Sequence, residues 1–248
     1  MTLALNTESR GTGGTPVLFA HSFAGDLTHW AAAMDSQVQT RRTVAFDFSG
    51  HGASPGSLGR YSYDELAKDI GAVAAPQQLD AFVLVGHSMG AAVTAECAAR
   101  NASRVRALIL VDPPMVPGAI PRDQLQQLQA SLDQDPYAVV EQFWNQQMFI
   151  DSRAEVQQRL MAGLRKMPRT AAVDLTREAF AVDSSVPLRQ YPGPRFTIVT
   201  PRNDTPLSLH RAVPEVKHVV IMGTGHWIHL DKPEVFNDAL NKMLKAVI

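Results

Sequence analysis

The sequence predicts an α/β fold with a mostly parallel, doubly wound sheet and an inserted block of helices. In the first half of the chain, near-continuous apolar runs of strand length alternate with helical patterns. Strands that read this way are usually buried on both faces, as in a parallel sheet. The alternation stops after Asp112-Pro113-Pro114 and resumes near Phe196. An alternation of strands and helices that is interrupted once is typical of a doubly wound sheet that carries an insertion.

The individual elements follow from these runs. We expect strands at residues 17–20, 43–46, 81–85, 107–111, 195–199 and 217–221, with the clearest helices at 63–75 and 91–100. Pro233 opens a last helix, because proline is favoured in the first turn. Residues 3–9, the glycine-rich turn 11–14 and the strand that follows are expected to form an antiparallel hairpin at one edge of the sheet.

From about residue 121 to 183 the sequence offers no good strand candidate, and amphipathic helices follow one another. Ser152 and Glu155 have the spacing of a capping box for one of these helices. We interpret residues 115–185 as a helical cap over the sheet, and residues 1–114 and 186–248 as the core. The length of 248 residues fits this organisation.

Composition excludes several classes of partner. The net charge is -1, and the charged residues are scattered, so neither nucleic acid nor an anionic membrane is expected to bind. Cys97 is the single cysteine and allows no intrachain disulfide. Residues 1–14 lack a signal-peptide layout, and no apolar run reaches the ~18 residues that span a bilayer. We expect a cytoplasmic protein, and the oligomeric state is left open.

The clearest motif is Gly86-His87-Ser88-Met89-Gly90. It follows an apolar strand and precedes a helix of small residues, which is the setting of a nucleophile elbow. Such a turn strains the serine backbone, and flanking glycines let strand and helix approach without side-chain clashes. The amide end of the following helix favours negative charge beside the serine. We therefore predict that Ser88 is a nucleophile, the alternative being a serine that only caps a helix.

A serine nucleophile needs a base and a third group that orients the base. His226 follows the strand expected at 217–221, and Gly225 frees the backbone to turn the imidazole toward the elbow. Asp204 lies in the loop after the strand at 195–199, and Asp112 ends the strand at 107–111. The chain order of serine, acid and histidine favours Asp204, with Asp112 as the competitor.

The developing alkoxide needs two backbone N–H groups. We expect one from Met89, directly after the nucleophile, and one from Phe23 in the loop after the strand at 17–20. None of the other histidines has a motif of its own that competes with His226. No carboxylate or cysteine spacing around the histidines supports a metal site, so none is expected.

The sequence resembles the α/β-hydrolase family of small bacterial esterases, lactonases and C–C hydrolases with a helical cap. Four signatures match in order: the loop that begins at His21, the segment Asp47-Phe48-Ser49-Gly50-His51-Gly52-Ala53-Ser54, the elbow at Ser88, and Gly225-His226. The second is similar to a D-x-x-G-x-G-x-S turn whose role is mostly structural, which is also our interpretation of His51. One departure is Ser22, which stands where the family usually has glycine and adds a hydroxyl beside the oxyanion loop.

The resemblance implies hydrolysis of a carboxylic ester or lactone through an acyl-enzyme on Ser88, without a cofactor. C–C bond hydrolysis and cofactor-free perhydrolysis use the same triad and stay open. A hydroxynitrile lyase would carry lysine after the base, where Trp227 stands. Other classes are a ligand receptor with slow turnover, and a non-catalytic relative, against which the intact triad argues.

The substrate is expected to be a small apolar ester or lactone. Phe23 and Trp227, together with Trp144, Met148 and Phe149 of the cap, suggest an apolar acyl pocket. Aromatic residues at helical spacing also form the packed interior of a cap, so pocket and packing are alternative roles for these three cap residues.

Overall fold

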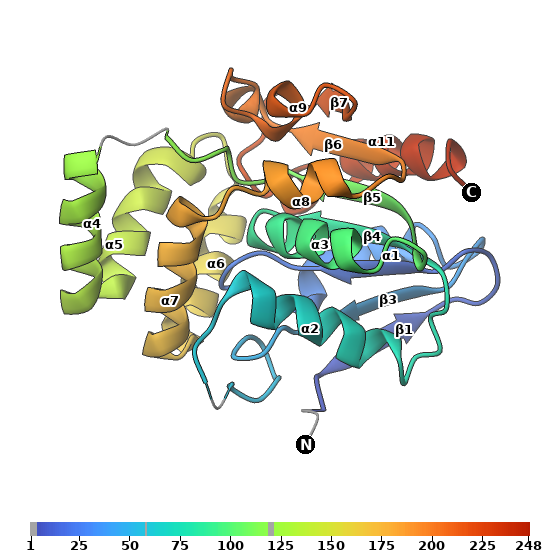
Figure 1. Ribbon diagram of the computed structural model, residues 1–248, viewed down its shortest axis with the longest axis horizontal. Helices are drawn as coiled ribbons and strands as arrows, with labels where there is room; N and C mark the ends of the chain where they lie inside the picture. Colours follow the sequence, from blue (N-terminus) through green and yellow to red (C-terminus); the bar gives the residue numbers. More distant parts are fainter. Residues whose placement is uncertain (1–3, 58, 119–121) are drawn as a thin grey trace.

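The computed structural model describes residues 4–57, 59–118 and 122–248 (Figure 1). Its centre is a seven-stranded sheet with the order β1-β3-β2-β4-β5-β6-β7. The strands are β1 (Thr7–Arg10), β2 (Val17–Ala20), β3 (Thr43–Phe46), β4 (Phe82–His87), β5 (Val105–Val111), β6 (Arg195–Val199) and β7 (Lys217–Val220). Only the edge pair of β1 with β3 is antiparallel among these strands. The predicted α/β class with a mostly parallel sheet is confirmed.

The expected hairpin at residues 3–20 is wrong in its pairing. β1 does lie at an edge, but it pairs with β3, with Thr7 opposite Phe46, while β2 lies on the other side of β3. The turn between β1 and β2 packs against the chain that enters β3, since a Cβ on Gly14 would lie 2.6 Å from the carbonyl oxygen of Thr40. The glycines therefore allow a close crossing of two chain segments rather than a two-stranded turn.

Helices cover both faces of the sheet (Figure 1). One face carries α2 (Tyr63–Ala74), α3 (Met89–Arg100) and α8 (Ser185–Gln190); the other carries η1 (Leu27–Trp30), α1 (Ala31–Asp35) and α11 (Pro233–Lys245). Successive residues of one strand point to opposite faces, so Leu18 packs in one apolar cluster and Phe19 in the other. This double burial explains the near-continuous apolar runs of the strands.

Between β5 and β6 the chain forms a helical segment, which Figure 1 places at the carboxyl ends of the strands. It comprises α4 (Arg122–Gln134), α5 (Pro136–Phe143), the π-helix η2 (Trp144–Met148), α6 (Ala154–Lys166) and α7 (Arg169–Ala181). The predicted capping box is wrong: α6 is preceded by Arg153 without a side-chain cap. Ser152 instead donates to the carboxylate of Asp231, at the end of α10 (Ile228–Asp231), at 2.9 and 3.0 Å. It thus ties the helical segment to the core.

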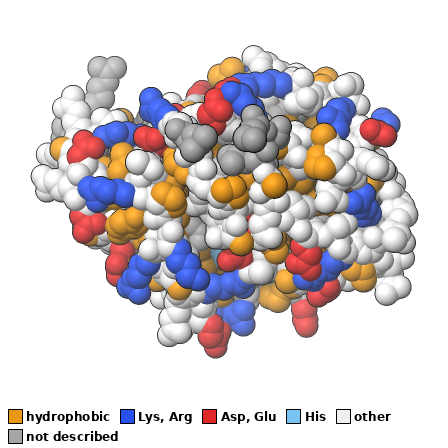
Figure 2. All heavy atoms as spheres, turned by 90° about the horizontal axis from the view of Figure 1, so that it is seen from below, with side chains coloured by type: hydrophobic (Ala, Val, Ile, Leu, Met, Phe, Trp, Pro, Cys, Tyr) orange, Lys and Arg blue, Asp and Glu red, His pale blue; other side chains and the backbone are white. Residues whose placement is uncertain are grey.

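The surface mixes charges of both signs with apolar side chains. On the face seen in Figure 2, lysines and arginines lie among aspartates, glutamates and hydrophobic side chains. Among the residues that the structure describes, no helix combines the length and the apolar character needed to cross a membrane.

Candidate active site

Ser88 occupies the sharp turn between β4 and α3. Its φ of 52° and ψ of -117° lie outside the regions that residues with a side chain favour, so the turn holds backbone strain. The turn is fixed because Ser88 N–H donates to the carbonyl of Val111 at 2.9 Å. The side chain makes no capping hydrogen bond to α3. Ser88 is therefore held at the amino end of a helix with its hydroxyl available.

The glycines on either side of Ser88 are required by close backbone contacts. A Cβ on Gly86 would lie 2.4 Å from the carbonyl oxygen of Gly90, and a Cβ on Gly90 would lie 2.4 Å from that of His21. No side chain fits at such distances. The elbow therefore brings β4, α3 and the loop after β2 together at one point.

His226 lies in the loop after β7, and its backbone is held from two sides. Its N–H donates to the carbonyl of Met148 at 3.3 Å, and its own carbonyl accepts from His87 Nε2 at 3.0 Å. Gly225 lets the helical segment approach, because a Cβ there would lie 2.6 Å from the Cβ of Ser152. The imidazole is thereby anchored by both the elbow and the helical segment.

The acid that meets the imidazole is Asp112 rather than Asp204. Asp112 Oδ2 lies 2.6 Å from His226 Nδ1, and the two side chains are 4% and 10% exposed. Asp112 Oδ1 accepts from the backbone N–H of Thr200 at 2.8 Å and from its hydroxyl at 3.1 Å. Because an ionised carboxylate only accepts, this contact places the proton on Nδ1 and leaves Nε2 as the basic nitrogen.

The prediction that Asp204 orients His226 is wrong about this contact. Asp204 Oδ1 accepts from His210 Nε2 at 3.0 Å and from Arg211 at 2.8 and 3.1 Å. These hydrogen bonds lower the pKa of Asp204, and the bond from His210 has the larger effect. The loops after β5 and β6 leave neighbouring strands at the same edge of the sheet, so either carboxylate is topologically possible. Asp112 makes the contact with His226 because Thr200 holds its carboxylate in place. The strained backbone of Asp112, with a φ of 39°, orients the side chain.

The loop after β2 contains Phe23, the second residue expected to donate to the oxyanion. His21 holds the loop: its Nδ1 donates to the carbonyl of Ser22 at 2.7 Å, and its Nε2 accepts from Phe48 N–H at 3.0 Å. Burial lowers the pKa of His21 to about 4, which keeps this pattern of one donor and one acceptor near neutral pH. Within the described residues, the N–H groups of Phe23 and Met89 donate to no protein acceptor. Both residues line the cavity that contains Ser88.

Ser22, where the family usually has glycine, is coupled to the residue after the base. The indole Nε1 of Trp227 donates to Ser22 Oγ at 3.2 Å, and both side chains are buried. The added hydroxyl thus satisfies an indole N–H that would otherwise lack a partner. The departure from the family pattern joins the oxyanion loop to the loop of His226.

A cavity of about 550 Å³ contains Ser88, Asp112 and His226 in its wall. Of the five residues expected at the apolar pocket, four line it: Phe23, Trp144, Met148 and Trp227. Phe149 is not among the lining residues; it packs behind them, with its ring 5.6 Å from Trp144 and 5.3 Å from Trp227. Many of the other lining residues had no sequence signal, among them Tyr63, Gln147 and Arg202. These three come from α2, η2 and the turn η3 (Pro201–Asn203), which only the fold brings together.

Other polar clusters lie outside this cavity. His210, in α9 (Leu209–Ala212), His218 and Asp204 bring possible ligand atoms within 4.8 Å of one another, although their spacing in the sequence gave no sign of it. Arg211 donates to the same carboxylate, and its positive charge opposes a cation there. His51 is buried and bonded to the carbonyl of Ser49, in keeping with a structural role.

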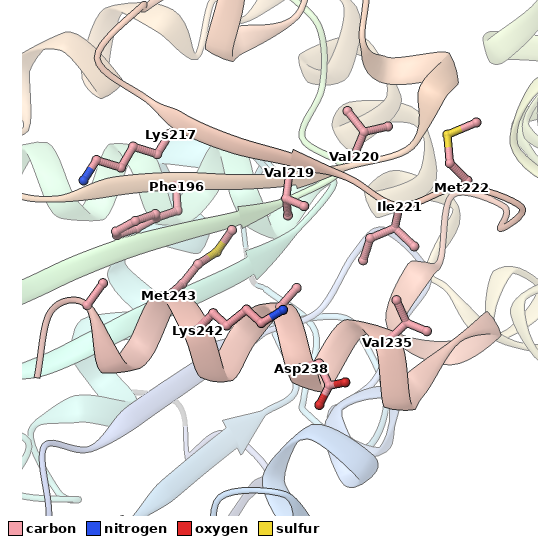
Figure 3. A pocket seen from close by; sticks show the side chains of 12 residues that line it. Phe196, Lys217, Val219, Val220, Ile221, Met222, Val235, Asp238, Lys242 and Met243 are labelled. Carbon is pink, nitrogen blue, oxygen red and sulfur yellow. The ribbon is translucent and has the colours of Figure 1, made fainter.

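A second hollow, of about 490 Å³, lies between β7 and α11. Figure 3 shows apolar side chains such as Phe196, Val219 and Met243 beside Lys217, Lys242 and Asp238. No serine, cysteine or histidine is among its described lining residues, so it lacks a hydroxyl or thiol nucleophile paired with a histidine base. The candidate active site is therefore the cavity at Ser88.

Comparison with known sequences assigns the chain to a family. A sequence model described as "Alpha/beta hydrolase family" matches residues 17–239. The chain belongs to the alpha/beta hydrolase family. The match runs from β2 into α11 and so includes Ser88, Asp112 and His226.

Individual relatives are similar over most of this chain. The acetyltransferase component of an acetoin-cleaving system from Pseudomonas putida is 30% identical over 96% of the chain, which spans 65% of that relative's length. Among solved structures, a thermophilic esterase from Thermogutta terrifontis gives a TM-score of 0.82 at 24% identity, covering 98% of this chain and 93% of that one. An enzyme that degrades N-acyl homoserine lactones gives 0.83 at 21% identity, covering 97% and 96%. At these identities the two structures establish the fold.

Proposed function

We propose that this protein is a serine hydrolase that cleaves a carboxylic ester or lactone through an acyl-enzyme on Ser88. One observation carries the proposal: a serine at a strained elbow and a histidine bonded to a buried carboxylate line the same cavity. This is the nucleophile, base and orienting acid that acyl transfer requires. The esterase and lactone-degrading enzyme named above share the fold and are consistent with this chemistry.

In the proposed reaction, His226 Nε2 takes the proton of the Ser88 hydroxyl as Ser88 Oγ attacks the carbonyl carbon. Asp112 holds the proton on Nδ1 and stabilises the imidazolium that forms. When the tetrahedral intermediate collapses, the bond to the leaving oxygen breaks and His226 returns the proton to that oxygen. Water then repeats the sequence on the acyl-enzyme, releases the acid and regenerates Ser88.

The negative oxygen of the intermediate needs donors that are already oriented. We assign this role to the N–H groups of Phe23 and Met89. The amino end of α3 adds a favourable field at the same point, because its first N–H groups lack partners within the helix. His21 stabilises the loop that contains Phe23, because its Nδ1 donates to the carbonyl of Ser22.

We also propose that the helices between β5 and β6 act as a lid, with residues 115–185 as the cap and residues 1–114 and 186–248 as the core. Trp144 and Met148 of η2 line the cavity, so substrate passes beneath this segment. The contact of Met148 with the backbone of His226 couples the lid to the base.

The test is turnover of p-nitrophenyl esters of increasing chain length, run beside a set of lactones. The wild-type protein should turn over repeatedly, and Ser88→Ala should lower kcat by on the order of 10⁶ while keeping its fold. A single burst without recycling would identify a receptor rather than an enzyme. Activity of Ser88→Ala within about tenfold of wild type would reject the mechanism.

A further inference from the structure

The loop after β2 forms a four-residue turn that carries Phe23. The N–H of Gly25 donates to the carbonyl of Ser22 at 3.0 Å, so Phe23 and Ala24 are the two central residues of the turn. Ala24 has a φ of 56°, in the left-handed region that residues with a side chain seldom adopt. The N–H proposed to bind the oxyanion, that of Phe23, therefore belongs to a turn whose backbone is strained at the next residue.

Glycines of two different helices contact this loop. The described helices contain three glycines, which are Gly71 in α2, Gly90 in α3 and Gly163 in α6. A Cβ on Gly90 would lie 2.4 Å from the carbonyl oxygen of His21. A Cβ on Gly163 would lie 2.2 Å from the carbonyl oxygen of Ala24, whereas one on Gly71 would meet nothing described outside its own helix within 4 Å. The loop is thus packed against α3 on one side and against α6 of the helical segment on another.

Gly163 stands where α6 would otherwise present a side chain to the core. It follows Val156 by seven residues and Leu160 by three, so it lies on the same face of the helix as these two buried residues. Glycine inside a helix is unfavourable relative to alanine, so helix propensity does not account for it. The close approach of the Ala24 carbonyl does, because a backbone oxygen cannot rotate aside as the end of a flexible side chain can.

A second contact between α6 and this part of the chain lies one helical turn earlier. The guanidinium of Arg159 donates to the hydroxyl of Thr28 and lies 3.7 Å from the carboxylate of Asp26. Asp26 caps η1, because its carboxylate accepts from the N–H of Thr28 at 2.9 Å. α6 therefore contacts both the turn that carries Phe23 and the start of the helix that follows it.

We propose that Gly163 is a positioning residue of the oxyanion hole, which lets α6 hold the turn that carries the N–H of Phe23. The loop is then fixed at two points, by α3 at His21 and by α6 at Ala24. Movement of α6 away from the sheet would release the donor, so the helical segment governs the rate of acyl transfer as well as the choice of substrate. This inference rests on the proposed function, because it gives the contact a role in stabilising the tetrahedral intermediate.

The experiment compares Gly163→Ala with Gly71→Ala. Both variants add one Cβ to a helix, but only the first places it against a backbone carbonyl. The measured quantities are kcat and KM with a p-nitrophenyl ester and the inhibition constant of an alkyl trifluoromethyl ketone. In the proposed site, Ser88 Oγ adds to the carbonyl carbon of this ketone, its proton passes to His226, and the carbonyl oxygen becomes an alkoxide. The inhibition constant therefore reports on the oxyanion donors without a leaving group.

In Gly163→Ala we expect kcat to fall by about 10- to 100-fold, the effect of a displaced donor. KM should stay within about threefold, because the donors act on the transition state more than on the bound ester. The inhibition constant of the ketone should rise by the factor by which kcat falls. Gly71→Ala should keep all three values of the wild type, with an equal or higher Tm. A variant that is only destabilised would lose activity with its folded fraction and keep the inhibition constant.

Arg159→Ala is the second variant, for the case that Gly163→Ala fails to fold. The Arg159 side chain is 40% exposed, so its removal should leave the fold intact. Loss of its contacts with Thr28 and Asp26 should lower kcat and raise the inhibition constant in parallel, by about two- to fivefold. Wild-type values of both constants in folded Gly163→Ala overturn the inference, as they do in Arg159→Ala where that variant alone folds.

Amide hydrogen exchange separates failure of this inference from failure of the proposed function. Peptides that span residues 21–30 report on the turn without any turnover, and exchange there should be faster in Gly163→Ala than in wild type or Gly71→Ala. If this is found in a protein that hydrolyses no ester, the hydrolase proposal fails and the hold of α6 on the turn stands. If esters are hydrolysed but exchange, kcat and the inhibition constant of Gly163→Ala match those of Gly71→Ala, the positioning role is overturned.

Discussion

Two aspartates at the same edge of the sheet have different electrostatic partners. Asp112 is buried against Thr200 and the imidazole of His226, and no arginine competes for it among the described ion pairs. Asp204 accepts from Arg211 and His210 and is more exposed. A carboxylate that keeps an imidazole in one tautomer must be held rigidly and shielded from water. Only Asp112 meets both requirements.

Exchange of each carboxylate for an amide tests this assignment. Asp112→Asn should lower kcat by on the order of 10⁴, because asparagine can force the wrong histidine tautomer and removes the charge that stabilises imidazolium. Asp204→Asn is the matched control and should change kcat by less than about tenfold, since it disturbs a largely surface pair. The measurement is kcat with a p-nitrophenyl ester, with circular dichroism to verify folding. A larger loss in Asp204→Asn would return the role of the acid to Asp204.

For individual catalytic residues, the sequence was most informative where a local motif exists. Ser88 and His226 were predicted from a short pattern beside an apolar strand, and the structure places both in one cavity. The acid has no such pattern, because any carboxylate after β5 or β6 reaches the same edge of the sheet. Gln147 and Arg202 had no signal at all, since only the fold brings their elements to the cavity.

The π-helix η2 is one of several elements of the helical segment that line the cavity. Its first residue, Trp144, is buried, lines the cavity and packs with ring centroids 5.2 Å from Trp227 and 6.2 Å from Phe23. The sequence left two alternative roles for Trp144, lining a pocket or packing in the interior of the cap. In the structure Trp144 does both. π-helical turns often occur at functional sites, and the extra residue in the turn has no signature in apolar periodicity.

Substitution of Trp144 should therefore have two separable effects. Trp144→Ala should lower the free energy of unfolding by about 3–5 kcal/mol, the usual cost of deleting a buried aromatic side chain. It should also change the ratio of kcat/KM between short and long esters, because a pocket wall affects each substrate unequally.

Phe149→Ala is the matched control for Trp144→Ala, since Phe149 belongs to the same aromatic cluster without lining the cavity. It should lose stability to a similar extent and keep the chain-length preference of wild type. Urea unfolding and the ester panel measure the two effects. Equal changes of preference in both variants would show that Trp144 acts only through packing.

Across the whole molecule, the sequence predicted the strands better than their order. The five inner strands were recognisable because burial on two faces leaves an apolar run. The position of β3 between β1 and β2 depends on a crossover through α1 and on contacts of the turn glycines with residues 38–41, which no local pattern encodes. The same holds for Ser152, whose link to Asp231 joins residues 79 positions apart.

In the proposed mechanism, catalysis passes through a covalent ester on Ser88. The most direct measurement is the intact mass of the protein, quenched in acid during turnover of a p-nitrophenyl ester, followed by peptide mapping. We expect one added acyl group, located on Ser88, that disappears once substrate is exhausted and is absent in Ser88→Ala. Hydrolysis without any acyl adduct in rapidly quenched samples, or an adduct on another residue that Ser88→Ala retains, would rule out Ser88 as the nucleophile.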